Sequence, residues 1–82
     1  MTITGEQIRA ARELIRWRQS NLAEQSGVSL DTIKRLEAIR GEVSANVRTV
    51  DAIVQTFRDA GVRFLEKSND AGVGVRVMER EE

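Results

Sequence analysis

The chain has 82 residues, enough for one domain with a small core. It contains neither cysteine nor histidine, which excludes a disulfide framework and the usual zinc ligands. Its 13 basic and 13 acidic residues give zero net charge, so a nucleic-acid-binding surface would have to come from the distribution of charge. The longest apolar run, residues 52–54, is too short for a transmembrane helix or a signal peptide. We therefore expect a cytoplasmic protein without a metal or cofactor.

The first predicted helix runs from about residue 5 to Trp17 and follows a short arm, residues 1–3. Thr4 and Gln7 have the spacing of a capping box, in which each side chain accepts a hydrogen bond from the other residue's backbone N–H. The apolar stripe is formed by residues at helical spacing: Ile8, Ala11, Leu14 and Ile15. Trp17 is expected to close this helix and to pack beside the next one.

Residues 19–38 are typical of two short helices joined by a tight turn. Gly27 can take the positive φ that the turn requires, and Val28 is expected to be buried behind it. Ser29 is placed to cap the second helix. The residues expected to face one another between the two helices are Leu22, Ala23, Ile33 and Leu36. Those expected to point outward from the second helix are Leu30, Asp31, Lys34 and Arg35.

The second helix of this pair is expected to end at Ala38 or to continue to Arg40, and a loop follows. Ser44 or Asn46 then caps a fourth helix over about residues 47–60. Its apolar face is formed by residues at helical spacing: Val50, Ile53, Val54 and Phe57. We expect this face to complete the core.

The C-terminal part of the chain changes to a period of two. Alternating segments at residues 62–65 and 73–77 flank a polar stretch with glycine, which predicts a β-hairpin within residues 62–78. An isolated hairpin is marginal in water, so it must pack on the helices or pair with another chain. The expected organisation is a helical domain over residues 1–61, the hairpin, and a frayed tail over residues 79–82. The predicted fold class is mainly α.

The helix pair resembles the helix-turn-helix of the lambda-repressor-like family, also called the xenobiotic-response-element family. The matching residues are Gln19, Leu22, Ala23, Gly27, Val28, Ser29, Ile33, Leu36 and Glu37. The resemblance extends from about Ile8 to about Phe64 and implies a four-helix lambda-repressor-like domain. It also implies a structural ion pair between Arg12 and Glu37. Arg18 departs from the family pattern, which commonly has serine or threonine before the glutamine.

The resemblance implies a sequence-specific, double-stranded DNA-binding transcriptional regulator, expected to be a repressor. The helix at about residues 30–38 would enter the major groove. There Arg35 could donate to guanine, Asp31 could accept from cytosine N4, and Leu30 could contact a thymine methyl. The candidate DNA-binding residues are Arg18, Gln19, Ser20, Ser29, Leu30, Asp31, Thr32, Lys34, Arg35 and Arg40. As the plainer alternative, Lys34 and Arg35 form only a solvated face and Asp31 serves only the helix dipole.

The resemblance further implies a bacterial or phage homodimer that binds two half-sites, associated with the nucleoid when bound. The hairpin is the candidate dimerisation element, through strand pairing or its valine face. A second function remains open: an antitoxin or adaptor whose main partner is a protein such as a toxin. A third is a helix-turn-helix fold that has lost DNA binding and serves only assembly. An enzyme is not expected, because the chain lacks histidine, cysteine and a glycine-rich phosphate loop.

Overall fold

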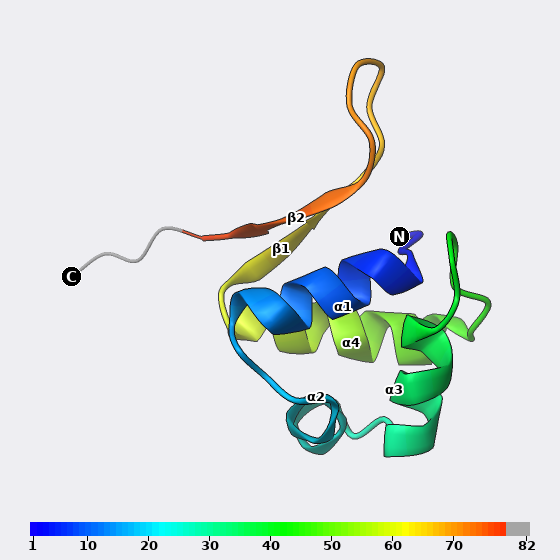
Figure 1. The fold of residues 1–82 in the computed structure, drawn as a ribbon, viewed down its shortest axis with the longest axis vertical. Helices are drawn as coiled ribbons and strands as arrows, with labels where there is room; N and C mark the ends of the chain where they lie inside the picture. Colours follow the sequence, from blue (N-terminus) through cyan, green and yellow to red (C-terminus); the bar gives the residue numbers. More distant parts are fainter. Residues whose placement is uncertain (79–82) are drawn as a thin grey trace.

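A computed structural model describes residues 1–78 as four helices followed by a two-stranded antiparallel sheet (Figure 1). The elements are α1 (Gly5–Leu14), α2 (Gln19–Ser26), α3 (Leu30–Glu37), α4 (Val47–Asp59), β1 (Val62–Leu65) and β2 (Gly74–Val77). The predicted fold class, mainly α with a C-terminal hairpin, is confirmed. The tail predicted over residues 79–82 lies outside the described residues. Among the residues described, no helix is both long and apolar enough to cross a membrane.

Helix α1 begins at the predicted capping box but ends earlier than expected. The Gln7 backbone N–H donates to Thr4 Oγ1 at 3.0 Å, and the Thr4 N–H donates to Gln7 Oε1 at 2.9 Å. The helix ends at Leu14 because the chain turns away through Arg16, whose φ is 58°. Leu14, in the last turn, is 47% exposed and does not widen the apolar stripe. Trp17 therefore lies beyond α1 and not within it, and it stacks on Phe57 with ring centroids 5.8 Å apart.

The third residue of the N-terminal segment belongs to the core, whereas Met1 and Thr2 are exposed. Ile3 is 1% exposed, and its carbonyl accepts from the Val43 N–H at 3.0 Å. Thr4 forms an isolated antiparallel bridge with Glu42. These contacts bring the loop after α3 back across the start of α1. The expected arm over residues 1–3 is therefore wrong for Ile3 alone, because the sequence does not show what covers this residue.

The helix pair forms as predicted, with a different end to α3. Gly27 has φ 76°, and Ser29 Oγ accepts from the Thr32 N–H at 3.2 Å. Helix α3 stops at Glu37, before both predicted ends, and Ala38 is its C-cap. The chain turns there because it must pass close to α1: a Cβ on Gly5 would lie 2.1 Å from the Ile39 carbonyl oxygen. Val28 is half-buried instead of fully buried.

Helix α4 is capped by Asn46, whose Oδ1 accepts from the Thr49 N–H at 2.8 Å. Its end is followed by Gly61 at φ 90°. The core is formed by the buried apolar residues of the four helices and β1, together with one residue before α1: Ile3, Ile8, Ala11, Leu22, Ile33, Leu36, Val50, Ile53, Phe57, Val62 and Phe64. The apolar face predicted for α4 thus supplies the centre of the core, although Val54 is only half-buried.

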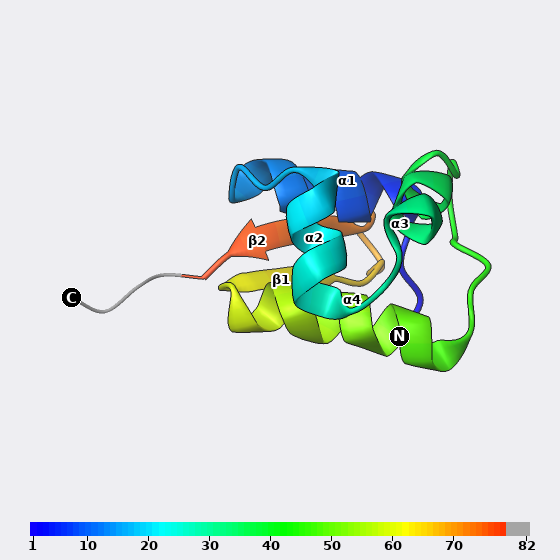
Figure 2. The same ribbon diagram turned by 90° about the horizontal axis from the view of Figure 1, so that it is seen from below.

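The hairpin packs on the helices through its valine face. Its register pairs Val62 with Val77 and Phe64 with Val75. Val62 and Phe64 are buried, and the Phe64 ring lies 5.6 Å from that of Phe57. Figures 1 and 2 show the sheet as a second layer against α1 and α4. Val75 is therefore already covered within one chain, whereas Val73 and Val77 are 44% and 47% exposed.

Candidate nucleic-acid interface

The outer side of α3 carries three charged side chains. Ile33 and Leu36 are fully buried beneath the helix, which leaves Asp31, Lys34 and Arg35 exposed on the opposite side. Within residues 1–78, none of the three forms an ion pair, although Asp31 and Arg35 are one turn apart. Both cations are therefore available to a ligand. Leu30, at the start of the helix, is 36% exposed.

A shallow depression joins this helix to α1 and α2. Its lining residues are Arg9, Arg12, Gln19, Lys34, Glu37 and Ala38. The fold thus brings Gln19 and Lys34 to one surface, although they are separated along the chain. Arg9 was missing from the predicted set, and it reaches this surface from α1. Its guanidinium lies 3.5 Å from the Glu13 carboxylate, and both side chains are mostly exposed.

Arg9 belongs to a visible cluster of arginines in the first part of the chain, but the sequence does not show which of them faces α3. In the structure Arg9 faces α3, because it lines the same depression as Gln19 and Lys34. Spacing along α1 gives a weaker signal: Arg9 lies three residues before Arg12, so the two share a side of the helix.

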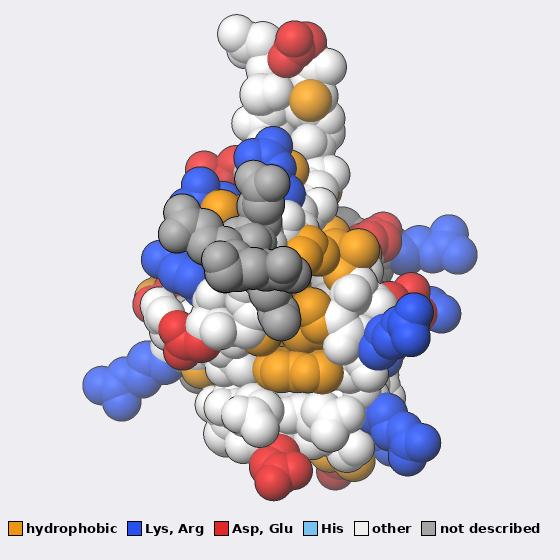
Figure 3. Space-filling model, turned by 90° about the vertical axis from the view of Figure 1, so that its left-hand side faces the viewer, with side chains coloured by type: hydrophobic (Ala, Val, Ile, Leu, Met, Phe, Trp, Pro, Cys, Tyr) orange, Lys and Arg blue, Asp and Glu red, His pale blue; other side chains and the backbone are white. Residues whose placement is uncertain are grey.

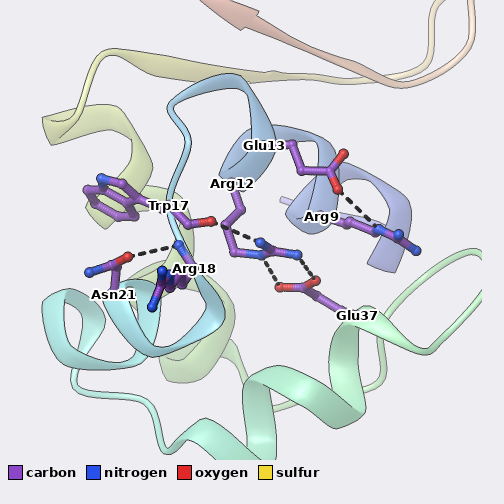
Figure 4. A network of polar contacts seen from close by, with 7 residues as sticks. All are labelled: Arg9, Arg12, Glu13, Trp17, Arg18, Asn21 and Glu37. Atoms are coloured by element: carbon purple, nitrogen blue, oxygen red, sulfur yellow. Dashed lines mark hydrogen bonds and ion pairs between the residues drawn. The ribbon is translucent and has the colours of Figure 1, made fainter.

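The predicted ion pair, drawn in Figure 4, joins two of the residues that line the depression. Arg12 Nε donates to Glu37 Oε2 at 2.9 Å and Nη2 donates to Oε1 at 3.0 Å, a bidentate geometry. Arg12 Nη1 donates to the Trp17 carbonyl at 2.9 Å. The side chains are 15% and 5% exposed. The hydrogen bond to Glu37 raises the pKa of Arg12. The paired Arg12 side chain joins α1 to α3.

At the start of α2, the polar contacts differ from a capping box. The Arg18 side chain makes no capping hydrogen bond; instead, the Arg18 N–H donates to Asn21 Oδ1 at 2.8 Å (Figure 4). Asn21 was not predicted, although its place three residues after the N-cap was a signal for this role. The Arg18 side chain remains exposed, as does that of Ser20.

At the start of α3, two predicted residues bind each other. Ser29 Oγ donates to Thr32 Oγ1 at 2.9 Å, besides accepting the Thr32 N–H. The hydroxyl proton of Ser29 is therefore used within the chain. Thr32 is half-buried, whereas Ser29 is exposed. Their main contribution is to fix the helix terminus that presents Leu30 and Asp31.

Arg40 lies apart from the other candidates. It follows the C-terminal end of α3, whereas Leu30 begins that helix. Glu6 Oε1 accepts from the neighbouring Gly41 N–H at 2.9 Å. This hydrogen bond is the main reason why the pKa of Glu6 is lowered, and the charge of Arg40 adds to it. Arg40 does not line the depression formed by Gln19 and Lys34.

On the side of the molecule shown in Figure 3, the basic residues do not form a continuous surface. On the side shown in Figure 3, Lys and Arg side chains alternate with Asp and Glu side chains around an apolar area. The outer side of α3 differs, because it carries two cations and one carboxylate that form no ion pair with the rest of residues 1–78. Neither the protein-family models nor the curated proteins compared with this chain gave a match. The case for a function therefore rests on the geometry and on the motif.

Proposed function

We propose that the protein is a sequence-specific, double-stranded DNA-binding transcriptional regulator, and that it acts as a repressor. The observation that carries this proposal is the outer side of α3, where Lys34 and Arg35 are exposed and without an ion pair within residues 1–78. The start of α2 lies on the same surface through Gln19. This is the arrangement by which a helix-turn-helix places its second helix in the major groove.

The proposed base contacts come from the exposed side of α3. The helix has eight residues and is therefore about 12 Å long, which suits the width of the major groove. Arg35 would donate two hydrogen bonds to guanine, and Asp31 would accept one from cytosine N4. Leu30, which is partly exposed, would pack on a thymine methyl.

The proposed phosphate contacts surround this helix. Lys34 and Gln19 share the depression with Arg9, whose ion pair with Glu13 is exposed and therefore easily exchanged for a phosphate. Arg18 and Ser20 lie at the start of α2, where backbone N–H groups add donors. Arg12 is excluded from this set because Glu37 already neutralises it. Its proposed part is to fix the position of α3.

The test is a pair of alanine substitutions with a matched control. Binding sites are first selected from random duplexes at a stated salt concentration, because affinity depends strongly on salt. Arg35→Ala should lose about 1–3 kcal/mol of DNA-binding free energy and relax the preference at one base position. Lys34→Ala should weaken binding to all sequences and should lower by about one the slope of log affinity against log salt concentration. Arg58→Ala, an exposed residue of α4, should change neither. Equal affinity of the wild type and the Lys34→Ala/Arg35→Ala variant would overturn the proposal.

One such module contacts few base pairs, so we extend the proposal to a homodimer on two half-sites about 34–36 Å apart. The hairpin is the proposed dimerisation element. Because Val62 and Phe64 already pack inside the chain, the dimer would have to use the rest of the hairpin. Sedimentation velocity of the full chain without DNA measures this directly. A monomer at every concentration up to the solubility limit would exclude the dimer.

A further inference from the structure

One edge of strand β2 is open. The strand pairs with β1 on one side, and within residues 1–78 no other strand pairs with it. The Met78 N–H donates to the Gly61 carbonyl at 2.7 Å, which fixes the alternation of hydrogen bonds along the ladder. In the observed register, Val75 and Val77 then stand at positions that exchange no hydrogen bonds with β1. Their backbone N–H and C=O groups therefore point to the open side, which we call the β2 edge.

Exposed apolar side chains lie along the β2 edge. Val73 and Val77 are 44% and 47% exposed, and they lie on the same face of the strand as the half-buried Val75. This face is the one that packs on the helices. Natural sheets commonly protect an open edge with inward-pointing charges or with proline, but β2 has valine at its inward positions. The side-chain pattern of β2 is therefore typical of a strand with neighbours on both sides.

Helix α1 supplies a further exposed apolar side chain beneath the β2 edge. Figure 1 shows α1 and β2 running in the same direction, and the two elements are in contact. Leu14 lies two turns after Gln7 on the same side of α1, and Gln7 Nε2 donates to the Gly74 carbonyl at 2.9 Å. Seven residues of helix and three residues of strand each advance about 10 Å, so Leu14 lies at the level of Val77. A strand added at the β2 edge would cover Leu14, which is 47% exposed.

The opposite face of β2 carries a positive charge. The register pairs Arg76 directly with Arg63, and like charges in this position destabilise an antiparallel pair. Both side chains are exposed, and among residues 1–78 neither forms an ion pair. A carboxylate on an added strand, opposite Arg76, would offset this repulsion.

A second copy of this chain does not fit as the added strand. Figure 2 shows β2 between α1 and β1, so α1 lies beneath the place where an added strand would run. Two copies that joined their β2 edges would do so around a two-fold axis, and each would bring its own α1 to this place. Strands lie about 4.8 Å apart, whereas a helix is about 10 Å across, so the two helices would overlap. The β2 edge therefore accepts an extended segment that has no helix beneath it.

We propose that the β2 edge binds an extended, acidic segment of a partner protein, which adds a third strand to the sheet. The segment alternates apolar and acidic residues. Its backbone exchanges hydrogen bonds with Val75 and Val77, its apolar side chains pack on Leu14 and Val77, and a carboxylate pairs with Arg76. Backbone pairing supplies affinity, and the alternating side chains supply specificity. This inference does not rest on DNA binding, and a homodimer through the hairpin would use another part of it.

The test uses the full chain and a blocked synthetic peptide of alternating valine and glutamate, about seven residues long. Binding is followed by NMR hydrogen exchange. In the free protein, the Val75 and Val77 amides should exchange rapidly, whereas the Arg76 amide, which faces β1, should be protected. The peptide should slow exchange at Val75 and Val77 and leave Arg76 unchanged. A valine–lysine peptide of the same length is the matched control and should bind at least about fivefold more weakly, because its ammonium groups meet Arg76.

Two substitutions separate the backbone contact from the charge. Val77→Pro removes an outward N–H without removing a hydrogen bond to β1, and it should weaken binding of the valine–glutamate peptide about tenfold. Val77→Ala keeps this N–H and should weaken binding clearly less. Arg76→Glu gives Arg63 an opposite charge, so it should stabilise the hairpin while reversing the preference to the valine–lysine peptide. Arg58→Glu, an exposed change on α4, should leave both affinities as they are.

The outcomes separate the explanations. The proposal is overturned if the valine–glutamate peptide shows no saturable binding up to about 1 mM, or if the two peptides bind equally. A Val77→Pro variant with full peptide affinity and wild-type circular dichroism would also overturn it. Protected Val75 and Val77 amides in a free protein that sediments as a dimer would place a second copy at the edge and overturn the choice of partner. Weaker duplex binding in Arg76→Glu with unchanged peptide affinity would instead make this face a nucleic-acid contact. Since the peptide assay contains no DNA, a failure of the DNA-binding proposal would leave its results unaffected.

Discussion

Two regions of the molecule are attached to α1 by polar contacts of opposite kinds. Near the start of the helix, the neutral amide of Gln7 binds the hairpin, and it is 3% exposed. One turn and a half later, the charged Arg12 binds Glu37 of α3. The first contact uses both N–H groups of the amide on carbonyls, and its oxygen closes the capping box. The second places two formal charges away from water.

The hairpin and α3 should therefore respond differently when their polar contact with α1 is removed by substitution. A neutral amide loses only hydrogen bonds when it is replaced, whereas a buried charge left without its partner carries a larger desolvation cost. The proposed DNA-reading helix therefore depends on the more fragile of the two attachments.

Replacing Glu37 should have the largest effect. Glu37→Ala leaves the Arg12 guanidinium mostly buried without a carboxylate and should lower the free energy of unfolding by about 3–5 kcal/mol, measured by urea denaturation. Arg12→Met/Glu37→Leu removes both charges and should cost clearly less. If the double variant lost as much stability as the single one, the cost would come from packing and not from an uncompensated charge.

Replacing Gln7 should have an intermediate effect. Gln7→Ala removes all three side-chain hydrogen bonds and should cost about 1–3 kcal/mol. Gln7→Glu tests the hairpin contact separately from the capping box. It keeps the acceptor for the Thr4 N–H but places a carboxylate oxygen against two carbonyl oxygens. It should speed hydrogen exchange at the Met78 N–H, which donates to Gly61 at 2.7 Å, more than at the Ile33 N–H. Equal acceleration at both amides would show that the hairpin is not a separately attached unit.

The cap of α4 offers a smaller effect that should leave both attachments intact. Asn46→Ala removes the acceptor for the Thr49 N–H and should cost about 1 kcal/mol. In the double variant, the losses in the free energy of unfolding caused by Asn46→Ala and Gln7→Ala should add, since the two sites share no partner. A strongly non-additive double variant would indicate that the helix cap and the hairpin are coupled.

The smallest expected effect is the loss of the stability contributed by Glu6 at low pH. The Gly41 N–H lowers the pKa of Glu6, so this carboxylate contributes stability above its unfolded pKa and loses it as the pH falls through the lowered folded value. A titration of the Glu6 side-chain carboxyl carbon by NMR should show a midpoint below the ordinary value. Glu6→Gln should remove the matching acid-dependent shift of the Gly41 amide. The pKa of Arg12 is raised, so the stability that this group contributes is lost only when the pH rises into strong alkali. Arg12 therefore adds nothing to the dependence of stability on acid.

Local spacing was sufficient to predict the helices, the hairpin and several caps. Thr4 with Gln7, and Ser29 before α3, bind groups within three residues, so their signals lie inside short windows of sequence. The early end of α1, the burial of Ile3 and the position of Arg9 depend on contacts with distant segments. No short window contains them. The predicted base contacts and phosphate contacts remain predictions, although the fold places most of them around α3.

The binding of Gln7 to the hairpin could not be predicted from neighbouring residues in the sequence. Its capping partner is three residues away, whereas its hairpin partners, Leu65 and Gly74, are 58 and 67 residues away. The sequence signal for a capping glutamine was complete without them. A buried amide has two donors besides its acceptor, and the count of unused donors is the clue that points to a further partner.

The contact between Gln7 and Gly74 has a consequence for how the protein is made. During synthesis, the four helices can gather around Ile33 and Phe57 before the second strand exists. The Gln7 amide, however, lacks one of its two carbonyl partners until the chain through Gly74 has left the ribosome. A nascent chain that stalls within the hairpin loop therefore leaves one N–H of this buried amide without its partner. We expect such stalled chains to be cleaved first within the still undocked hairpin.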